Sequence, residues 1–194
     1  MRTLRNLVHR EFPELEDRCQ IERADANEWV QRCCREQDWR AWRAVAFLDP
    51  YGMNVEWATL EAIARTKAID LWLLFPLGIG ASRVLPAGTP PEGTWADRLT
   101  KLLGTGDWRD RFYRKERRSD LFDDADDAWT KVAGVPQILD FFLERMKGIF
   151  ARAVDRPMIL KNSRNSPMYA LCFAAGNARG AKAAVNTATH LTRP

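Results

Sequence analysis

The residues best suited to chemistry in this sequence stand in the stretch Asp49-Pro50-Tyr51-Gly52, directly after an apolar segment from Arg43 to Leu48. An apolar segment that stops at a proline and a glycine is typical of a buried strand followed by a turn. In open α/β sheets, ligands bind beyond the carboxyl ends of the strands. We therefore expect Asp49 and Tyr51 to face a ligand, with Pro50 shaping the turn between them.

This turn could support methylation of an amino group. A carboxylate and nearby backbone carbonyls can accept hydrogens from an exocyclic amine, while an aromatic ring stacks on a base. The candidate catalytic residues are therefore Asp49, Pro50 and Tyr51. The alternative is an ordinary Asp-Pro turn at the end of a strand, and the residues of the turn taken alone favour that alternative.

A second acid, Asp25, lies between a predicted short strand from Arg18 to Arg23 and a predicted helix that runs to about Glu36. Asp25 or Asn27 can cap that helix. Asp25 can equally accept a hydrogen bond from the adenine amine of a nucleotide cofactor, with Ala26 in the same turn. The candidate cofactor-binding residues are Asp25, Ala26 and Asp49.

A third group of candidate residues interleaves basic and aromatic side chains, as nucleic-acid surfaces do. A solvated helix face explains the same pattern, and that is the preferred interpretation. The acids that follow are expected at the start of the next helix, where negative charge complements the helix dipole. The basic residues are Arg111, Arg114, Lys115, Arg117 and Arg118, and the acids are Asp120, Asp123, Asp124, Asp126 and Asp127.

Composition indicates one globular domain over residues 1–194, with 46% apolar residues and a net charge of +4 that would suit an RNA or DNA partner. The four cysteines form no Cys-x-x-Cys pair, and we expect reduced thiols in a cytoplasmic protein. The two histidines, His9 and His190, lie at opposite ends of the chain, so no metal site is expected. No apolar run is long enough to predict a membrane span.

Hydrophobic periodicity predicts alternating strands and helices, and hence an α/β fold with parallel connections. A helical insertion is expected over residues 86–133, in which Gly104-Thr105-Gly106 ends a helix. The predicted helices are Arg2–Glu11, Glu56–Thr66, Trp95–Leu103, one ending near Val154, and Asn177–Leu191; the predicted strands are Arg43–Leu48, Ile69–Phe75, and a hairpin of Pro157–Asn162 with Met168–Ala174.

Several short motifs of this sequence form a longer pattern: Phe47-Leu48-Asp49-Pro50-Tyr51-Gly52, Glu56-Trp57-x-Thr59-Leu60-Glu61-x-Ile63-Ala64-x-Thr66, Asp70-Leu71-Trp72, Phe75-Pro76 and Pro167-Met168-Tyr169-x-Leu171-x-Phe173-Ala174-x-x-Gly176-Asn177. This pattern resembles the three-Cys-motif partner family (TcmP). The resemblance implies a partial Rossmann-like, doubly wound sheet of the class I methyltransferase type with a C-terminal antiparallel hairpin. It also implies an S-adenosyl-L-methionine-dependent methyltransferase-like domain, and a radical-SAM-like three-Cys-motif partner of phage or mobile-element origin.

Two departures from the family pattern bear on the site. Amino-methyltransferases usually carry Asp-Pro-Pro-aromatic, whereas here Tyr51 is third and Gly52 fourth. Relative to the family, Met1 falls in the helix after the second strand, so the glycine-rich turn and the ribose-binding acid have no counterpart in this sequence. The portion without a counterpart would be roughly 60 to 90 residues. We therefore expect weak or no independent binding of the cofactor.

Two functions remain open. The first is an amino-methyltransferase acting on nucleic acid, with Asp49 on the amine and Asp25 on the cofactor adenine. The second is a non-catalytic scaffold or partner protein that retains the methyltransferase fold as a docking surface. Tryptophans near predicted turns would suit such an interface, although core positions would suit them equally; they are Trp39, Trp42, Trp95 and Trp108. A third reading is plain nucleic-acid binding through Arg111 to Arg118.

Overall fold

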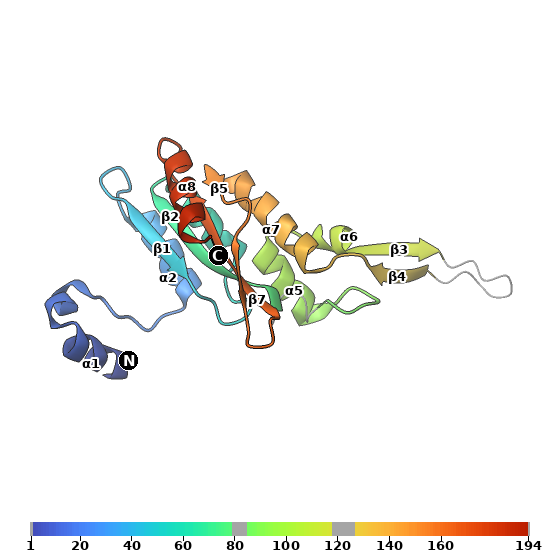
Figure 1. Cartoon of the computed structure of the whole chain (residues 1–194), viewed down its shortest axis with the longest axis horizontal. Coiled ribbons are helices and arrows are strands. Elements are labelled where there is room, and N and C mark those ends of the chain that lie inside the picture. The colour runs from blue at the N-terminus through green and yellow to red at the C-terminus, as the bar shows by residue number, and fades with distance from the viewer. Residues whose placement is uncertain (1, 79–84, 118–126, 194) are drawn as a thin grey trace.

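The computed structural model describes residues 2–78, 85–117 and 127–193 of the chain. These residues form a mixed α/β fold with a five-stranded mixed sheet, helices on both of its faces, and a separate two-stranded sheet (Figure 1). Among the described residues, each helix is too short or too polar to serve as a bilayer-spanning segment.

The large sheet has the order β1-β2-β7-β5, and β6 pairs with the first half of β7, from Pro167 to Leu171. β1 and β2 are parallel and are joined through α3, whereas β7 runs antiparallel to β2, β5 and β6. The predicted parallel pair and the predicted C-terminal hairpin are both confirmed. The strands are β1 (Ala44–Leu48), β2 (Ile69–Pro76), β5 (Arg152–Ala153), β6 (Met158–Lys161) and β7 (Pro167–Ala175).

The helices follow the predicted periodicity closely, and Gly104 ends α5 as expected, in the left-handed conformation with φ 71°. Glycine is required there because a Cβ would lie 2.1 Å from Cγ of Trp57. The helices are α1 (Arg2–Glu11), α2 (Ala26–Glu36), α3 (Trp57–Arg65), α5 (Gly93–Leu103), α6 (Trp108–Phe112), α7 (Val135–Ile149), α8 (Ala181–Leu191) and the 3-10 helix η1 (Pro13–Arg18).

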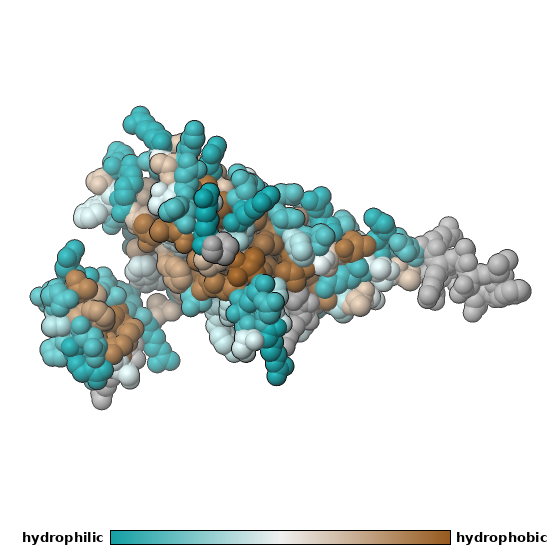
Figure 2. Space-filling model, in the orientation of Figure 1, coloured by the Kyte–Doolittle hydropathy of each residue, from teal (hydrophilic) through white to brown (hydrophobic). Residues whose placement is uncertain are grey.

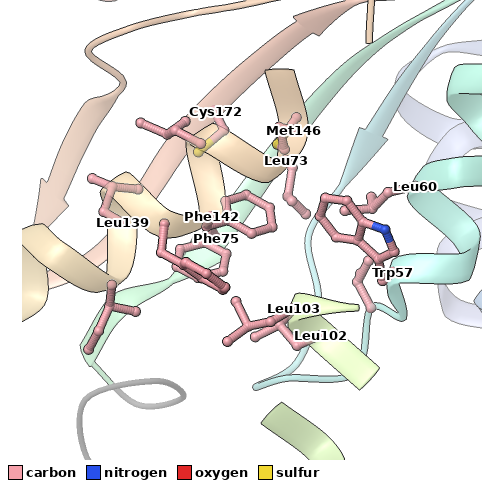
Figure 3. Close-up of a cluster of buried hydrophobic side chains, with 14 of the residues drawn as sticks. Trp57, Leu60, Leu73, Phe75, Leu102, Leu103, Leu139, Phe142, Met146 and Cys172 are labelled. Carbon is pink, nitrogen blue, oxygen red and sulfur yellow. The ribbon is translucent and has the colours of Figure 1, made fainter. Parts of the chain in front are cut away.

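Alternation along β2 divides the core between two faces of the sheet. Leu71, Leu73 and Phe75 are fully buried on the face covered by α3, α5 and α7. Phe75 stacks on Phe142 of α7 with ring centroids 4.0 Å apart (Figure 3). On the other face, Trp72 packs with β7 and α8.

The predicted strand from Arg18 to Arg23 is wrong. Arg18 ends η1, and residues 19–23 form no ladder. The carbonyl of Ile21 accepts a hydrogen bond from the Arg5 guanidinium at 3.0 Å instead. The segment is exposed apart from the half-buried Ile21, so its alternating apolar residues are not buried against the sheet. In Figure 1, α1 and η1 lie apart from the sheet.

The segment predicted as a helical insertion is only partly helical. It contains α5 and α6, but the basic run continues as strand β3 (Tyr113–Arg117), antiparallel to β4 (Asp127–Lys131). This ribbon projects from the body of the molecule (Figure 1). Asp127 therefore begins a strand rather than the next helix, and the other predicted acids, Asp120 to Asp126, lie outside the described residues.

The helix predicted to run to about Val154 ends earlier, at Ile149, where α7 gives way to the short strand β5. Val154 itself donates its N–H to the carbonyl of Phe173 at 3.0 Å and is buried against α8. Pairing with β7 therefore replaces the final helical turn.

Candidate functional site

A pocket of about 430 Å³ lies at the carboxyl end of β1, where the sequence predicts a site. The catalytic candidates Asp49, Pro50 and Tyr51 follow β1 and line one side of the pocket. The first residues of α2 line the other side. The structure thus brings together two stretches that are more than 20 residues apart in the sequence. The lining residues are Ala26, Asn27, Phe47, Leu48, Asp49, Pro50, Tyr51, Asn54, Val55 and Thr59.

Asn27 holds the two walls of this pocket together. Its Nδ2 donates to the carbonyl of Asn54 at 2.8 Å, and its Oδ1 accepts from the backbone N–H of Glu56 at 3.0 Å and from the Thr59 hydroxyl at 2.8 Å. Thr59 is only 1% exposed and also receives a hydrogen bond from Gln31 of α2. The loop between β1 and α3 is therefore fixed to α2 by side-chain bonds.

The three catalytic candidates differ in environment. Pro50 is buried and anchors the turn, while Asp49 is exposed and Tyr51 is 93% exposed. Gly52 has φ 65°, a left-handed conformation that redirects the chain immediately after the tyrosine. Asp49 and Tyr51 are therefore accessible to a ligand.

Asp25 serves as the N-cap of α2, because its Oδ1 accepts the backbone N–H of Glu28 at 3.0 Å. The capping alternative is thus what the structure describes for Asp25, while Ala26 rather than Asp25 lines the pocket. The first N–H groups of a helix have no partner within it. The N–H groups of Ala26 and Asn27 are therefore suited to donate to a ligand.

Part of this lining could hold the adenine end of a nucleotide cofactor. The apolar side chains of Phe47 and Val55 can contact a planar ring, and the N–H groups of the first turn of α2 can donate to ring nitrogens. Within the described ranges, no group of three or more His, Cys, Asp or Glu residues is placed to hold a metal ion.

The predicted nucleic-acid residues are remote from the pocket in sequence and lie on the ribbon side of the molecule. Arg111 forms an ion pair with Glu144 of α7 at 3.0 Å. Arg114 and Lys115 are exposed on β3, and Arg117 is the last residue of that strand. Arg118 lies outside the described residues.

β1 forms one edge of the large sheet among the described strands. Ala44 donates its N–H to Ala68, so alternate residues Ala44, Ala46 and Leu48 serve the ladder with β2. The backbone groups of Val45 and Phe47 consequently point to the open side. Their side chains are 68% and 60% exposed, on the face where α8 covers Trp72 but not β1.

The candidate tryptophans divide between surface and core. Trp42 is 61% exposed and Trp95 50% exposed, whereas Trp108 is fully buried. Trp39 is half-buried and donates its Nε1 hydrogen to the carbonyl of Cys34 at 2.9 Å. Only Trp42, close to the start of β1, adds to the exposed edge of the sheet.

Sequence reasoning missed the residues that shape the pocket rather than face its ligand. Asn27 is predicted only as a helix cap, Thr59 enters only as a member of the family pattern, and the sequence predicts no role for Asn54 or Val55. Thr59 carries a sequence signal, since it is a hydroxyl on the face of α3 that otherwise contains Leu60 and Ile63. A buried hydroxyl implies a hydrogen-bond partner.

No protein-family model, curated protein or solved structure matches this chain.

Proposed function

We propose that this chain is an amino-methyltransferase-like domain of the three-Cys-motif partner type, with a Rossmann-like sheet, that uses S-adenosylmethionine to modify nucleic acid in the cytoplasm together with a three-Cys-motif partner. One observation supports this most strongly. Asp49, Pro50 and Tyr51 directly follow β1, which is parallel to β2, and they share one pocket with the amino end of α2. This is where ligands bind in open α/β sheets.

Each group in the pocket has a defined role in this proposal. The Asp49 carboxylate accepts a hydrogen bond from the exocyclic amine, which directs the nitrogen lone pair away from the carboxylate. The exposed ring of Tyr51 stacks on the base that bears the amine. The cofactor supplies an electrophilic methyl group, and holding the amine in position accounts for much of the rate acceleration. If the substrate is a duplex, the base must first be flipped out.

The test is transfer of labelled methyl groups to bulk RNA and DNA by the chain copurified with its partner. We expect Asp49→Ala to reduce the rate of methyl transfer by at least about 100-fold, because in this proposal Asp49 positions the amine that accepts the methyl group. Asp107→Ala is the matched control. Asp107 is exposed, as Asp49 is, but it does not line the pocket. Equal transfer by both variants would contradict the proposed role of Asp49.

Cofactor binding is tested separately by NMR titration of the ¹⁵N-labelled chain with S-adenosylhomocysteine. We expect binding weaker than about 1 mM, with shifts concentrated at Ala26, Asn27 and the turn after β1. Shifts confined to residues elsewhere would exclude this pocket as the adenine site.

A second candidate function is a non-catalytic scaffold, and the open edge of β1 favours it. Exposed backbone groups beside Val45 and Phe47 are suited to pair with a strand of another polypeptide. This function predicts that Val45→Lys, which alters the open edge outside the Asp49 pocket, abolishes partner binding while Asp49→Ala leaves it intact. Val132→Lys is the control, because Val132 is 46% exposed at a distant position after β4. Loss of methyl transfer in Asp49→Ala with the complex intact would favour the enzyme.

A further inference from the structure

A second cavity lies between β5 and α8, which are close together at the top of Figure 1. Its volume is about 640 Å³, within the usual range for a small-molecule site. β5 and β1 are the opposite edge strands in the order β1-β2-β7-β5, and β5 pairs with Ala174 and Ala175 of β7. The cavity shares no lining residue with the Asp49 pocket at the end of β1, so the two sites are separate.

The cavity is lined by three cations and one acid. Lys147 and Asp155 form an ion pair with Nζ and Oδ1 2.6 Å apart. Arg152 and Arg156 also line the cavity and are exposed. Lys147, and more weakly Arg152 and Arg156, hold the pKa of Asp155 below its ordinary value, so all three cations act on the same small volume.

The two arginines are not committed to other groups. Among the described residues, neither guanidinium makes an ion pair or hydrogen bond. With the Lys147 charge balanced by Asp155, the site retains two unpaired positive charges. From α8, Asn186 and Thr189 also line the cavity, and the Thr189 hydroxyl donates to the carbonyl of Val185 at 2.8 Å. The apolar part of the lining consists of Ala151, Ala153 and Val185.

We infer that this cavity binds a phosphate group. The guanidinium groups of Arg152 and Arg156 line the same cavity. A guanidinium group can donate two parallel hydrogen bonds to phosphate oxygens, which an ammonium group cannot do. The amide of Asn186 can accept from or donate to the remainder of the ligand. The phosphate belongs either to a free phosphorylated molecule or to a nucleic-acid backbone, and the two sources are distinguishable by experiment.

The experiment is calorimetric titration of the full chain with pyrophosphate at low salt, beside fluorescence anisotropy with a single-stranded octanucleotide. We expect R152A/R156A to weaken pyrophosphate binding by about 10-fold or more, since each lost bond to a charged group is substantial. The control R164A removes one exposed arginine at the β6–β7 turn and should bind as the parent chain does.

Asp155→Asn provides a test that misfolding cannot imitate. Asp155 is the one acid among the described residues that line the cavity, and its replacement also frees Lys147, so we expect pyrophosphate to bind up to about fivefold more tightly. If the octanucleotide binds much more tightly than pyrophosphate, with a steep dependence on salt, the phosphate is that of a nucleic acid. Tighter pyrophosphate binding supports a free ligand.

Two results would overturn the inference. One is the absence of binding of either probe up to about 10 mM, well beyond the range of specific sites. The other is pyrophosphate binding that R152A/R156A and D155N leave unchanged. Neither result bears on the Asp49 pocket, so this inference and the proposed function fail independently.

Discussion

Replacing Asn27 by alanine tests whether the pocket is held together as described. The variant loses three hydrogen bonds, two of them partly buried, and leaves the hydroxyl of the buried Thr59 without its acceptor. At about 1 kcal/mol for each bond, less for the exposed one, we expect the free energy of unfolding to fall by about 2 to 3 kcal/mol. Urea denaturation followed by circular dichroism measures this loss.

The same variant should loosen one loop selectively. Hydrogen exchange at the amide of Glu56 should accelerate more than exchange in β2, because only the former loses its acceptor. Asn162→Ala is the matched control, since that asparagine caps an exposed hairpin turn through two backbone N–H groups. We expect it to cost about 1 kcal/mol or less.

A double-mutant cycle with Thr59→Val isolates the bond between the two side chains. Asn27 and Thr59 are in direct contact at 2.8 Å, so their effects should be non-additive by about 1 kcal/mol. The reasoning is refuted if the free energy of unfolding of Asn27→Ala lies within about 1 kcal/mol of that of the parent chain. It is also refuted if the Glu56 amide is protected from hydrogen exchange as well as before.

Three further outcomes follow from the fold. Gly104→Ala should lower the free energy of unfolding by about 3 kcal/mol, measured in urea, because its Cβ adds left-handed strain to a collision with a buried indole ring. Glu16 raises the pKa of His9 above 6.5, so their contact is fully present below pH 6.5 and lost as pH rises through the higher value; NMR titration should show this, and Glu16→Gln should bring the pKa back down. Burial raises the pKa of the Cys172 thiol, so at pH 8 a disulfide reagent should label exposed Cys19 promptly and Cys172 only on unfolding.

The sequence was sufficient for elements whose pattern is local. β1, α3 and β2 each combine the right period with a clear stop, and Asp49 follows β1 where the Asp-Pro turn predicts. The C-terminal hairpin was predictable because Asn165 adopts the left-handed turn conformation, with φ 59°, that asparagine tolerates.

Elements that depend on distant partners were not predictable in this way. The residues from Arg18 to Arg23 alternate as a strand would, but a strand exists only where a neighbour accepts its backbone bonds. Likewise, the basic run becomes β3 because Lys131 and Thr130, well beyond it in the chain, pair with Tyr113 and Arg114. The role of Asn27 depends equally on a contact that the sequence does not show.

The placement of β7 in the middle of the sheet bears on how the chain folds during synthesis. The N–H of Gly176 bonds to the carboxylate of Asp70, 106 residues earlier. At usual translation rates, about 5 to 20 s separate the appearance of these two residues. Throughout that interval β2 lacks its β7 neighbour, and during the first part of it α7, which packs against Leu71, Leu73 and Phe75, has not yet been made either. We therefore expect β2 to keep one open edge on the nascent chain until β7 is made, so the large sheet is completed late in synthesis.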